Sequence, residues 1–551
     1  MQLPERPAWQ QTARKVQAHR DASIAKVDPP SVPDPLPRRV IGIPRQLLTT
    51  QEITITESSP ELLVAALAAG KLSATKVTKA FLRRAAIAQR LVNCVYELLS
   101  ERALARAKEL DDHYAQHKKP IGPLHGLPIS IKEHIGLEGL DNTAGFVGWV
   151  GQKSEIDSSV VKLLLDAGAV VYVRTTEPQG LMMIETNSNT TGVTVNPHNT
   201  SLTPGGSSGG ESALLSLFGS PLGIGSDIGG CIRSPAGNCA IYGFKPTNLR
   251  IPLLGIKASD LGQETILGTV GPLSTTLGGI ELFMKTVLET EPWKNDPSLH
   301  QMPWRSHESL LSRDGAKKFT IGVMRDDGII KPLPPVQRAL AEVVEKLKLV
   351  PGIEVIEWEP YKHDEAIEML KKLYFPDGGK KFYDCLKLSG EPPLPLIDMI
   401  LNEPGVECLN LQETWNWTLK REMFRYFYLE EWNKVAQDMD VILCPVHPNP
   451  APPIDTSRYW GYTSVWNLLD YPAIVFPVTR VDPVRDVKDP NYKPRSDLDK
   501  WYQDHYDPIL EKDGPVPLQL VAKKLQDEKV VRACRDIVEA IGLPFVNCLE
   551  G

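Results

Sequence analysis

The densest group of residues that could do chemistry lies between positions 204 and 247, in the run PGGSSGGESALLSLFGSPLGIGSDIGGCIRSPAGNCAIYGFKPT. Two glycine-rich turns, at 205–210 and 229–230, are separated by one apolar helical segment. Ser207, Ser208 and Cys231 place hydroxyl and thiol groups at these turns. Because glycine permits close approaches that other residues do not, the pattern indicates that backbone amides here meet a partner at short range.

Two other interpretations of the glycine-rich run need weighing. The turns could be tight turns and nothing more. They could also form a phosphate-binding loop, since a glycine-rich turn that opens a helix makes an anion site. However, no Gly-Lys-Ser/Thr follows, and Glu211 stands where a phosphate would favour positive charge. A nucleotide loop is therefore disfavoured.

The segments that must position these residues alternate between short apolar strands and helices. We predict strands at LPISIKE, AVVYVRT, FTIGVM, DVILCPV, AIVFPVT and VPLQLVA. Helices are predicted over 59–70 and 73–92, each with a serine cap, and over 101–117, 334–350 and 527–542. Strands that alternate with helices favour an α/β fold whose sheet is covered on both faces.

The ends and the connections of the chain have a different composition. Residues 1–55 are rich in proline and charge, which predicts an extended arm that is ordered by docking on the body. The segments 291–315 and 480–512 are polar and irregular, so we expect surface connections. No internal repeat is apparent.

Composition limits the classes of function and the partners. A chain of 551 residues with 42% hydrophobic and 23% charged residues can bury a large core, and its net charge of -7 disfavours nucleic acid as a partner. Eight scattered cysteines without zinc-like spacing favour reduced thiols in the cytoplasm. We expect no metal, no cofactor, no signal segment and no integral membrane segment, while a homodimer is the base-rate expectation for oligomeric state.

Several ordered motifs resemble one enzyme family. GGSSGGE followed by PLGIGSDIGGCIRSPA is similar to the amidase signature, and GPLHGLPISIKEHIG resembles the strand that carries that family's catalytic lysine. VNPHN, GPLSTT, EPWKND and RYWGYTSVWNLLDYPAIVFPVT extend the similarity to the fungal acetamidase branch, over most of residues 50–545. The resemblance implies an α/β/α sandwich with a central mixed, twisted sheet and an N-terminal helical layer, formed by one domain over 56–545 with a signature core at about 120–290.

The resemblance also assigns catalytic roles. It matches Lys132 to the family's base and Ser207 to its bridging serine in a cis peptide, and places Cys231 at the nucleophile, where the family has serine. A lysine flanked by LPISI loses its charge through desolvation and becomes a usable base, while a hydroxyl can relay a proton. The thiol would then form a covalent acyl intermediate.

Further residues of the signature receive supporting roles. The backbone amides of Ile228, Gly229 and Gly230, together with that of residue 231, would form an oxyanion hole. Asp227 and Arg233 would stabilise this turn by charge-assisted hydrogen bonds.

The remaining candidate residues have less support from the pattern. Ser208 would hydrogen-bond within the site or cap the following helix. His134, Trp460 and Trp466 are candidates for the substrate pocket, although an aromatic cluster is more often core and the family uses lysine, not histidine, as its base.

The cysteine at position 231 leaves three functions open. The leading one is hydrolysis of a small or medium amide through an acyl-enzyme. A thioester also reacts well with amines and thiols, so an acyltransferase or condensing enzyme is an alternative. A catalytically impaired binding protein, or a trapping variant of an amidase, is the third.

Overall fold

One large mixed sheet forms the centre of the molecule. The computed structural model describes residues 7–311, 319–436 and 438–550. Eleven strands are ordered β1-β3-β2-β6-β8-β7-β12-β13-β11-β9-β10, and β4 and β5 form a separate ribbon. The strands are β1 Val95–Leu98, β2 Pro128–Lys132, β3 Val170–Thr175, β4 Asn187–Ser188, β5 Gly192–Val193, β6 Leu222–Asp227, β7 Tyr242–Lys245, β8 Thr269–Ser274, β9 Phe319–Val323, β10 Ile353–Glu357, β11 Met439–Pro445, β12 Ala473–Arg480 and β13 Pro515–Val521.

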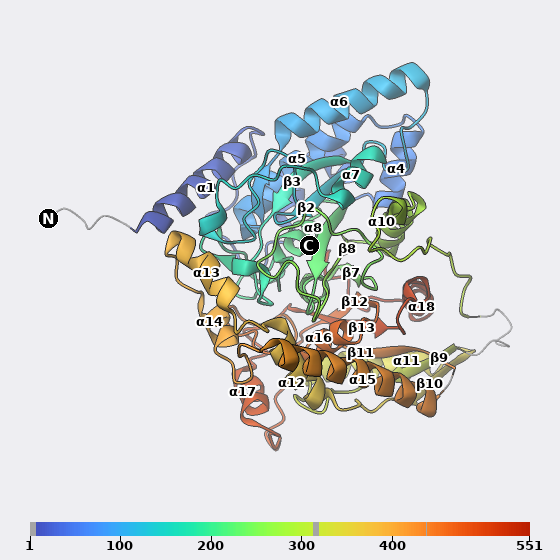
Figure 1. Cartoon of the computed structure of the whole chain (residues 1–551). Coiled ribbons are helices and arrows are strands. Elements are labelled where there is room, and N and C mark those ends of the chain that lie inside the picture. The colour runs from blue at the N-terminus through green and yellow to red at the C-terminus, as the bar shows by residue number, and fades with distance from the viewer. Residues whose placement is uncertain (1–6, 312–318, 437, 551) are drawn as a thin grey trace.

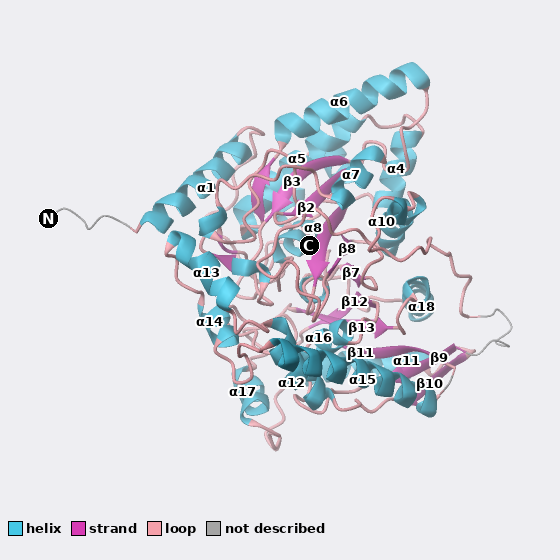
Figure 2. Ribbon diagram, viewed as in Figure 1, coloured by secondary structure: helices cyan, strands magenta, loops and turns pink. Residues whose placement is uncertain are grey.

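Helices surround this sheet, as Figure 2 shows. They are α1 Ala8–Ala25, α2 Ile43–Leu47, α3 Thr50–Thr56, α4 Pro60–Ala68, α5 Ala74–Val92, α6 Ser100–His117, α7 Ser159–Asp166, α8 Gly209–Ser216, α9 Arg233–Asn238, α10 Leu277–Glu289, α11 Pro334–Leu347, α12 His363–Tyr374, α13 Lys380–Ser389, α14 Pro395–Leu401, α15 Leu411–Val435, α16 Gly461–Leu468, α17 Asp497–His505 and α18 Asp527–Ile541. The side chains of Ser59 and Ser73 accept hydrogen bonds from the first turns of α4 and α5, as their sequences predict. Within the described residues, no helix combines the length and apolarity needed to cross a membrane.

The sheet separates the two larger hydrophobic cores near β11, and a third, smaller cluster lies around Leu273 and Val475. Along β11, Val441 and Leu443 belong to one core, whereas Ile442 and Cys444 belong to the other. Because alternate residues of a strand point to opposite faces, the two cores lie on opposite sides of the sheet at β11. Helices α5, α10, α11 and α18 contribute to the first core, and α12, α15 and α16 to the second. Figure 1 shows α5 and α6 near β3 at one end, and α12 and α15 at the other.

Strand direction brings two segments of the signature together. β2 is parallel to both β3 and β6, while β6 is antiparallel to β8. Ser130 and Ile131 of β2 pair with Gly223 and Ile224 of β6. Since parallel strands end at the same edge of a sheet, Lys132 at the end of β2 lies next to the end of β6.

The predicted α/β architecture with a mixed central sheet is confirmed. All six predicted strands are present, as are the five predicted helices. The sequence analysis did not predict short strands such as β1 and β7. It also missed the helix α17, which lies inside a segment that we expected to be irregular. Of the other such segment, 291–315, residues 312–315 lie outside the described residues.

The N-terminal arm is not extended as its prolines suggested. Residues 8–25 form α1, because a run of alanine, glutamine and basic residues precedes the proline-rich stretch. The arm does dock on the body: His19 Nε2 lies 2.8 Å from Glu97 Oε2, and Gln17 donates to the carbonyl of Thr190. Farther along, Thr200 N–H donates to the carbonyl of Arg38.

Candidate active site

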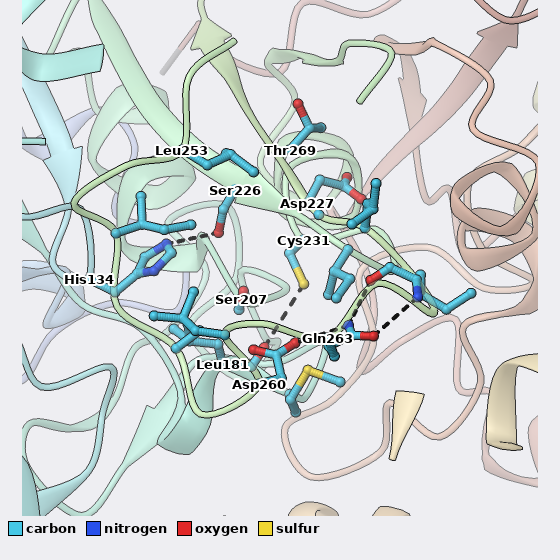
Figure 3. A pocket seen from close by; sticks show the side chains of 18 of the residues that line it. His134, Leu181, Ser207, Ser226, Asp227, Cys231, Leu253, Asp260, Gln263 and Thr269 are labelled. Carbon is cyan, nitrogen blue, oxygen red and sulfur yellow. Dashed lines mark hydrogen bonds between the residues drawn. The ribbon is translucent and has the colours of Figure 1, made fainter. Parts of the chain in front are cut away.

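The structure brings the three predicted catalytic residues to one wall. Lys132 ends β2, Ser207 precedes α8, and Cys231 follows the turn after β6. Lys132 Nζ lies 2.5 Å from Ser207 Oγ, and the Gly206–Ser207 peptide is cis, as the resemblance implied. The amide of Ser208 donates to the carbonyl of Cys231 at 3.1 Å, which holds the two turns together. Figure 3 shows Cys231 and Ser207 at the same cavity.

Lys132 is held in an environment that favours the neutral amine. It is fully buried, and burial lowers its pKa below 10.5, although the thiol of Cys231 and the carboxyls of Glu177 and Asp227 act in the opposite direction. Besides Ser207, its Nζ contacts Ser226 Oγ at 3.2 Å. The arrangement therefore offers a lysine base joined to a hydroxyl beside a thiol.

Hydrogen bonds fix the turn between β6 and Cys231. Tyr374 Oη donates to the carbonyl of Ile228 at 2.8 Å, and Thr463 Oγ1 donates to the carbonyl of Gly229 at 2.7 Å. In a trans peptide the N–H points away from the carbonyl. The amide of Gly229 is thus directed away from Tyr374.

One of the four predicted oxyanion amides already donates within the protein. The amide of Gly230 donates to Asp227 Oδ1 at 2.8 Å, because the carboxylate three residues earlier caps the turn. Within the described part of the chain, no acceptor is found for the amides of Ile228, Gly229 and Cys231 outside regular helices and strands. The oxyanion role of those amides stays a prediction, and Gly230 contributes its shape instead, since a Cβ there would collide with Thr463.

Asp227 and Arg233 form the buried ion pair expected under this turn. Arg233 Nε and Nη2 lie 3.0 Å from the two carboxylate oxygens, and both side chains are fully buried. Burial raises the pKa of Asp227, but the Arg233 guanidinium and the Asn467 amide outweigh it and hold that pKa well below its usual range. Arg233 also donates to the carbonyl of Thr463 at 2.9 Å, which ties the turn to α16.

Ser208 does not act as the sequence suggested. It precedes α8 as the N-cap residue, but its side chain caps no amide, and its buried Oγ has no hydrogen-bond partner among the described residues. The side chain lies close to Gly225, where a Cβ would meet Ser208 Oγ at 2.6 Å. Packing against β6 therefore places Ser208, and both predicted hydrogen-bonding roles were wrong.

A cavity of about 210 Å³ opens in front of Cys231 and Ser207. A second wall is the segment 253–269, which contributes mainly apolar residues. Three polar side chains, Asp260, Gln263 and Thr269, interrupt this apolar wall, and Figure 3 shows Asp260 and Gln263 on the side opposite Ser226. The cavity can take a small or medium substrate with its carbonyl at the thiol.

The three predicted pocket residues have different places. His134 lines the cavity, as expected. Trp460 lines a neighbouring cavity together with Tyr374, and its ring lies against Gly229 behind the turn. Trp466 is wrong as a pocket residue: it is fully buried in the second core, edge-on to Tyr428 at 6.2 Å between ring centroids.

Several residues of the site were missed by the sequence analysis. Ser226 could have been found, because it precedes Asp227 in the signature and β6 had to lie beside β2. Tyr374 lies far away in sequence and Asp260 sits in an irregular segment, so no local pattern marked them, whereas Thr463 belongs to the motif RYWGYTSVWNLLDYPAIVFPVT but was not singled out. Among the described residues, no cluster of three or more His, Cys, Asp or Glu could hold a metal ion.

Comparison with known proteins agrees with this geometry. The amidase family model matches residues 76–531. The chain is 39% identical to the acetamidase of Emericella nidulans, over 97% of this chain and 98% of that protein, and 38% identical to the acetamidase of Aspergillus oryzae, over 93% and 96%. A solved structure of a fatty acid amide hydrolase superposes with a TM-score of 0.92 at 34% identity, covering 98% of this chain and 96% of that one. The chain belongs to the amidase family, and its relatives identify it as an amide hydrolase.

Proposed function

We propose that the protein hydrolyses a carboxylic amide through an acyl-enzyme on Cys231, with Lys132 as base and Ser207 as proton relay. The observation that carries the proposal is the 2.5 Å contact between Lys132 Nζ and Ser207 Oγ beside the thiol. A fully buried lysine with a lowered pKa accepts a proton where a solvated lysine would not. The substrate is a small or medium amide, in keeping with the cavity of about 210 Å³.

The first half-reaction forms a thioester. Cys231 Sγ attacks the carbonyl carbon, while its proton passes to Ser207, whose own hydroxyl proton moves to Lys132 Nζ. The carbonyl oxygen becomes an oxyanion, for which the amides of Ile228, Gly229 and Cys231 are the candidate donors. When the C–N bond breaks, the proton returns from Lys132 through Ser207 to the leaving nitrogen.

The second half-reaction releases the acid. Water attacks the thioester carbonyl and gives its proton along the same relay, and the C–S bond breaks to regenerate the thiol. The ion pair of Asp227 and Arg233 takes no proton in either step. Its contribution is to keep the turn rigid while charge develops at the oxygen.

Intact-protein mass spectrometry tests the nucleophile. The protein is incubated with a panel of amides and activated esters, alongside Cys231→Ala, Cys231→Ser and the control Cys239→Ala. Cys239 is a suitable control because its thiol is also buried but lies against Pro204 and Ser212. We expect an acyl adduct on the native protein and on Cys239→Ala, and none on Cys231→Ala. Turnover that survives Cys231→Ala would overturn the proposal.

Adding an amine acceptor to the same assay separates hydrolysis from acyl transfer. Hydrolysis gives the free acid whether or not the amine is present, whereas an acyltransferase gives the new amide. Faster turnover by Cys231→Ser would mark the cysteine as a weakened form of a serine amidase. A cytoplasmic location and a homodimer remain predictions from composition and base rate.

A further inference from the structure

His134 lies two residues after Lys132 and has no part in the mechanism above. It is 2% exposed and lines the cavity at its edge. Its backbone is fixed on both sides: its amide donates to Glu177 Oε2 at 3.2 Å, and its carbonyl accepts from the amide of Lys257 at 2.9 Å. The backbone of His134 is therefore held by the protein, independent of substrate.

The hydrogen bonds of the ring define its tautomer. Nδ1 lies 2.9 Å from the carbonyl oxygen of Lys257, and a carbonyl only accepts, so Nδ1 carries the hydrogen. Burial, and then the nearby charge of Lys132, lower the pKa of His134 to about 3. At neutral pH the ring is uncharged, and Nε2 presents a lone pair.

That lone pair determines the orientation of Ser226. Nε2 lies 2.9 Å from Ser226 Oγ, so the Ser226 hydroxyl must donate its single hydrogen to His134. The oxygen of Ser226 can then only accept from Lys132 Nζ, which is 3.2 Å away. Figure 3 shows the His134–Ser226 contact at the cavity.

We propose that His134 is a positioning residue, which acts through Ser226 to aim the lone pair of the Lys132 amine at Ser207. A neutral amine has two hydrogens and one lone pair, and Ser226 takes one of the hydrogens. The lone pair is left for the Ser207 hydroxyl at 2.5 Å. Without an acceptor on His134, the Ser226 hydroxyl would turn and donate to that same lone pair, in competition with Ser207. The proposal rests on the proposed function, because it needs Lys132 as the base.

Two substitutions of His134 separate its two hydrogen bonds. The amide nitrogen of asparagine reaches the place of Nδ1, so His134→Asn keeps the bond to Lys257 but leaves the Ser226 hydroxyl without its acceptor on residue 134. The longer side chain of glutamine reaches the place of Nε2, so His134→Gln keeps an acceptor for Ser226 and gives up Lys257. We expect kcat to fall about 10- to 100-fold in His134→Asn, with KM little changed, and to recover most of that loss in His134→Gln.

A double-mutant cycle tests whether His134 works through Ser226. Ser226→Ala alone should lower kcat about as much as His134→Asn, and the two together should lower it no further, because they break one chain of contacts. Additive losses would overturn the proposal. So would a rise in KM at constant kcat, which would make His134 a substrate contact.

Two further measurements complete the test. If His134→Asn and His134→Gln lose activity only in proportion to a lowered melting temperature, the role of His134 is structural and the proposal fails. Lys132→Met, measured in parallel, reports on the proposed function itself. If activity survives in Lys132→Met, Lys132 is not the base, and the proposed mechanism fails whatever the His134 variants show.

Discussion

The two walls of the cavity are built in different ways. The wall with Lys132, Ser207 and Cys231 is at most 4% exposed and is tied to the sheet and to α16 by buried hydrogen bonds. The segment 253–269 combines local bonds, such as those from the amides of residues 265 and 266 to Gln263, with bonds to distant segments, such as that from Thr265 Oγ1 to the carbonyl of Leu373 at 2.6 Å, and its Leu261 is 51% exposed. The first wall fixes the chemistry, and the second can vary to select the substrate.

The walls meet at His134. Its backbone and its ring both bond to Lys257, which belongs to the second wall, while its other ring nitrogen reaches Ser226 on the first. Ile135 and Ile256 form a bridge at the same place. A change elsewhere in the segment 253–269 can therefore alter substrate selection, while the contacts of His134 with Lys257 and Ser226 hold Lys132 in place.

The largest effect is expected at the wall with Lys132, Ser207 and Cys231, and a comparison of two buried lysines tests it. Lys132 and Lys245 are both fully buried with lowered pKa values, but only Lys132 contacts Ser207. Lys245 donates to the carbonyl of Pro246, away from the cavity. Lys132→Met should lower kcat about 10²- to 10⁴-fold, whereas Lys245→Met should change it less than about threefold. Steady-state kinetics on both variants measures the difference.

pH separates the two lysines further. Lys132 works only as the neutral amine, so kcat/KM should rise with pH through its lowered pKa, and this limb should vanish in Lys132→Met. For Lys245, burial lowers the pKa to about 8, so between about pH 8 and 10.5 the unfolded chain binds more protons than the folded one. Stability should rise with pH across that window, and less so in Lys245→Met. An activity limb that survives Lys132→Met would contradict the assignment.

A second test compares two glycines on either side of the turn after β6. A Cβ on Gly229 would lie 2.8 Å from Tyr374 Oη and 3.2 Å from Trp460, whereas on Gly268 it would make an ordinary 3.5 Å contact with Ile228. Gly229→Ala should push Tyr374 off the carbonyl of Ile228 and move the candidate oxyanion amides, with a loss of about 100-fold in kcat. Gly268→Ala should lose less than about threefold. Equal losses would show that the turn is not the sensitive element.

The sequence could predict the site residues that lie in short motifs, but not those that reach the site through the packing of distant segments. Lys132, Ser207 and Cys231 were found because they lie in short motifs that resemble the amidase signature, and so do Asp227 and Arg233. Tyr374 comes to the site only through the packing of α12 on α16, which no local pattern encodes. Trp466 was misplaced because aromatic residues on a buried helix look alike in sequence whether they face a core or a cavity.

In the segment 253–269, one carboxyl group lines the cavity and could select substrates. Asp260 lines the cavity. Among the described residues, Gln263 Nε2 donates to its carboxylate at a long distance of 3.5 Å. Burial raises the pKa of Asp260, so the carboxylate gains from a cationic group on the substrate. We expect 6-aminohexanamide to be preferred over hexanamide about 3- to 10-fold in kcat/KM, and Asp260→Asn to remove this preference while hexanamide is turned over as before.

The pH dependence of that preference distinguishes charge from shape. The ammonium group gains from Asp260 only when the carboxyl is ionised, so the ratio of the two kcat/KM values should fall as the pH drops through the raised pKa of Asp260. Taking the ratio for one enzyme cancels the titration of Lys132, which both amides require. A preference that persists in Asp260→Asn, or that does not change with pH, would mean that the apolar residues of the segment 253–269 select the substrate by shape alone.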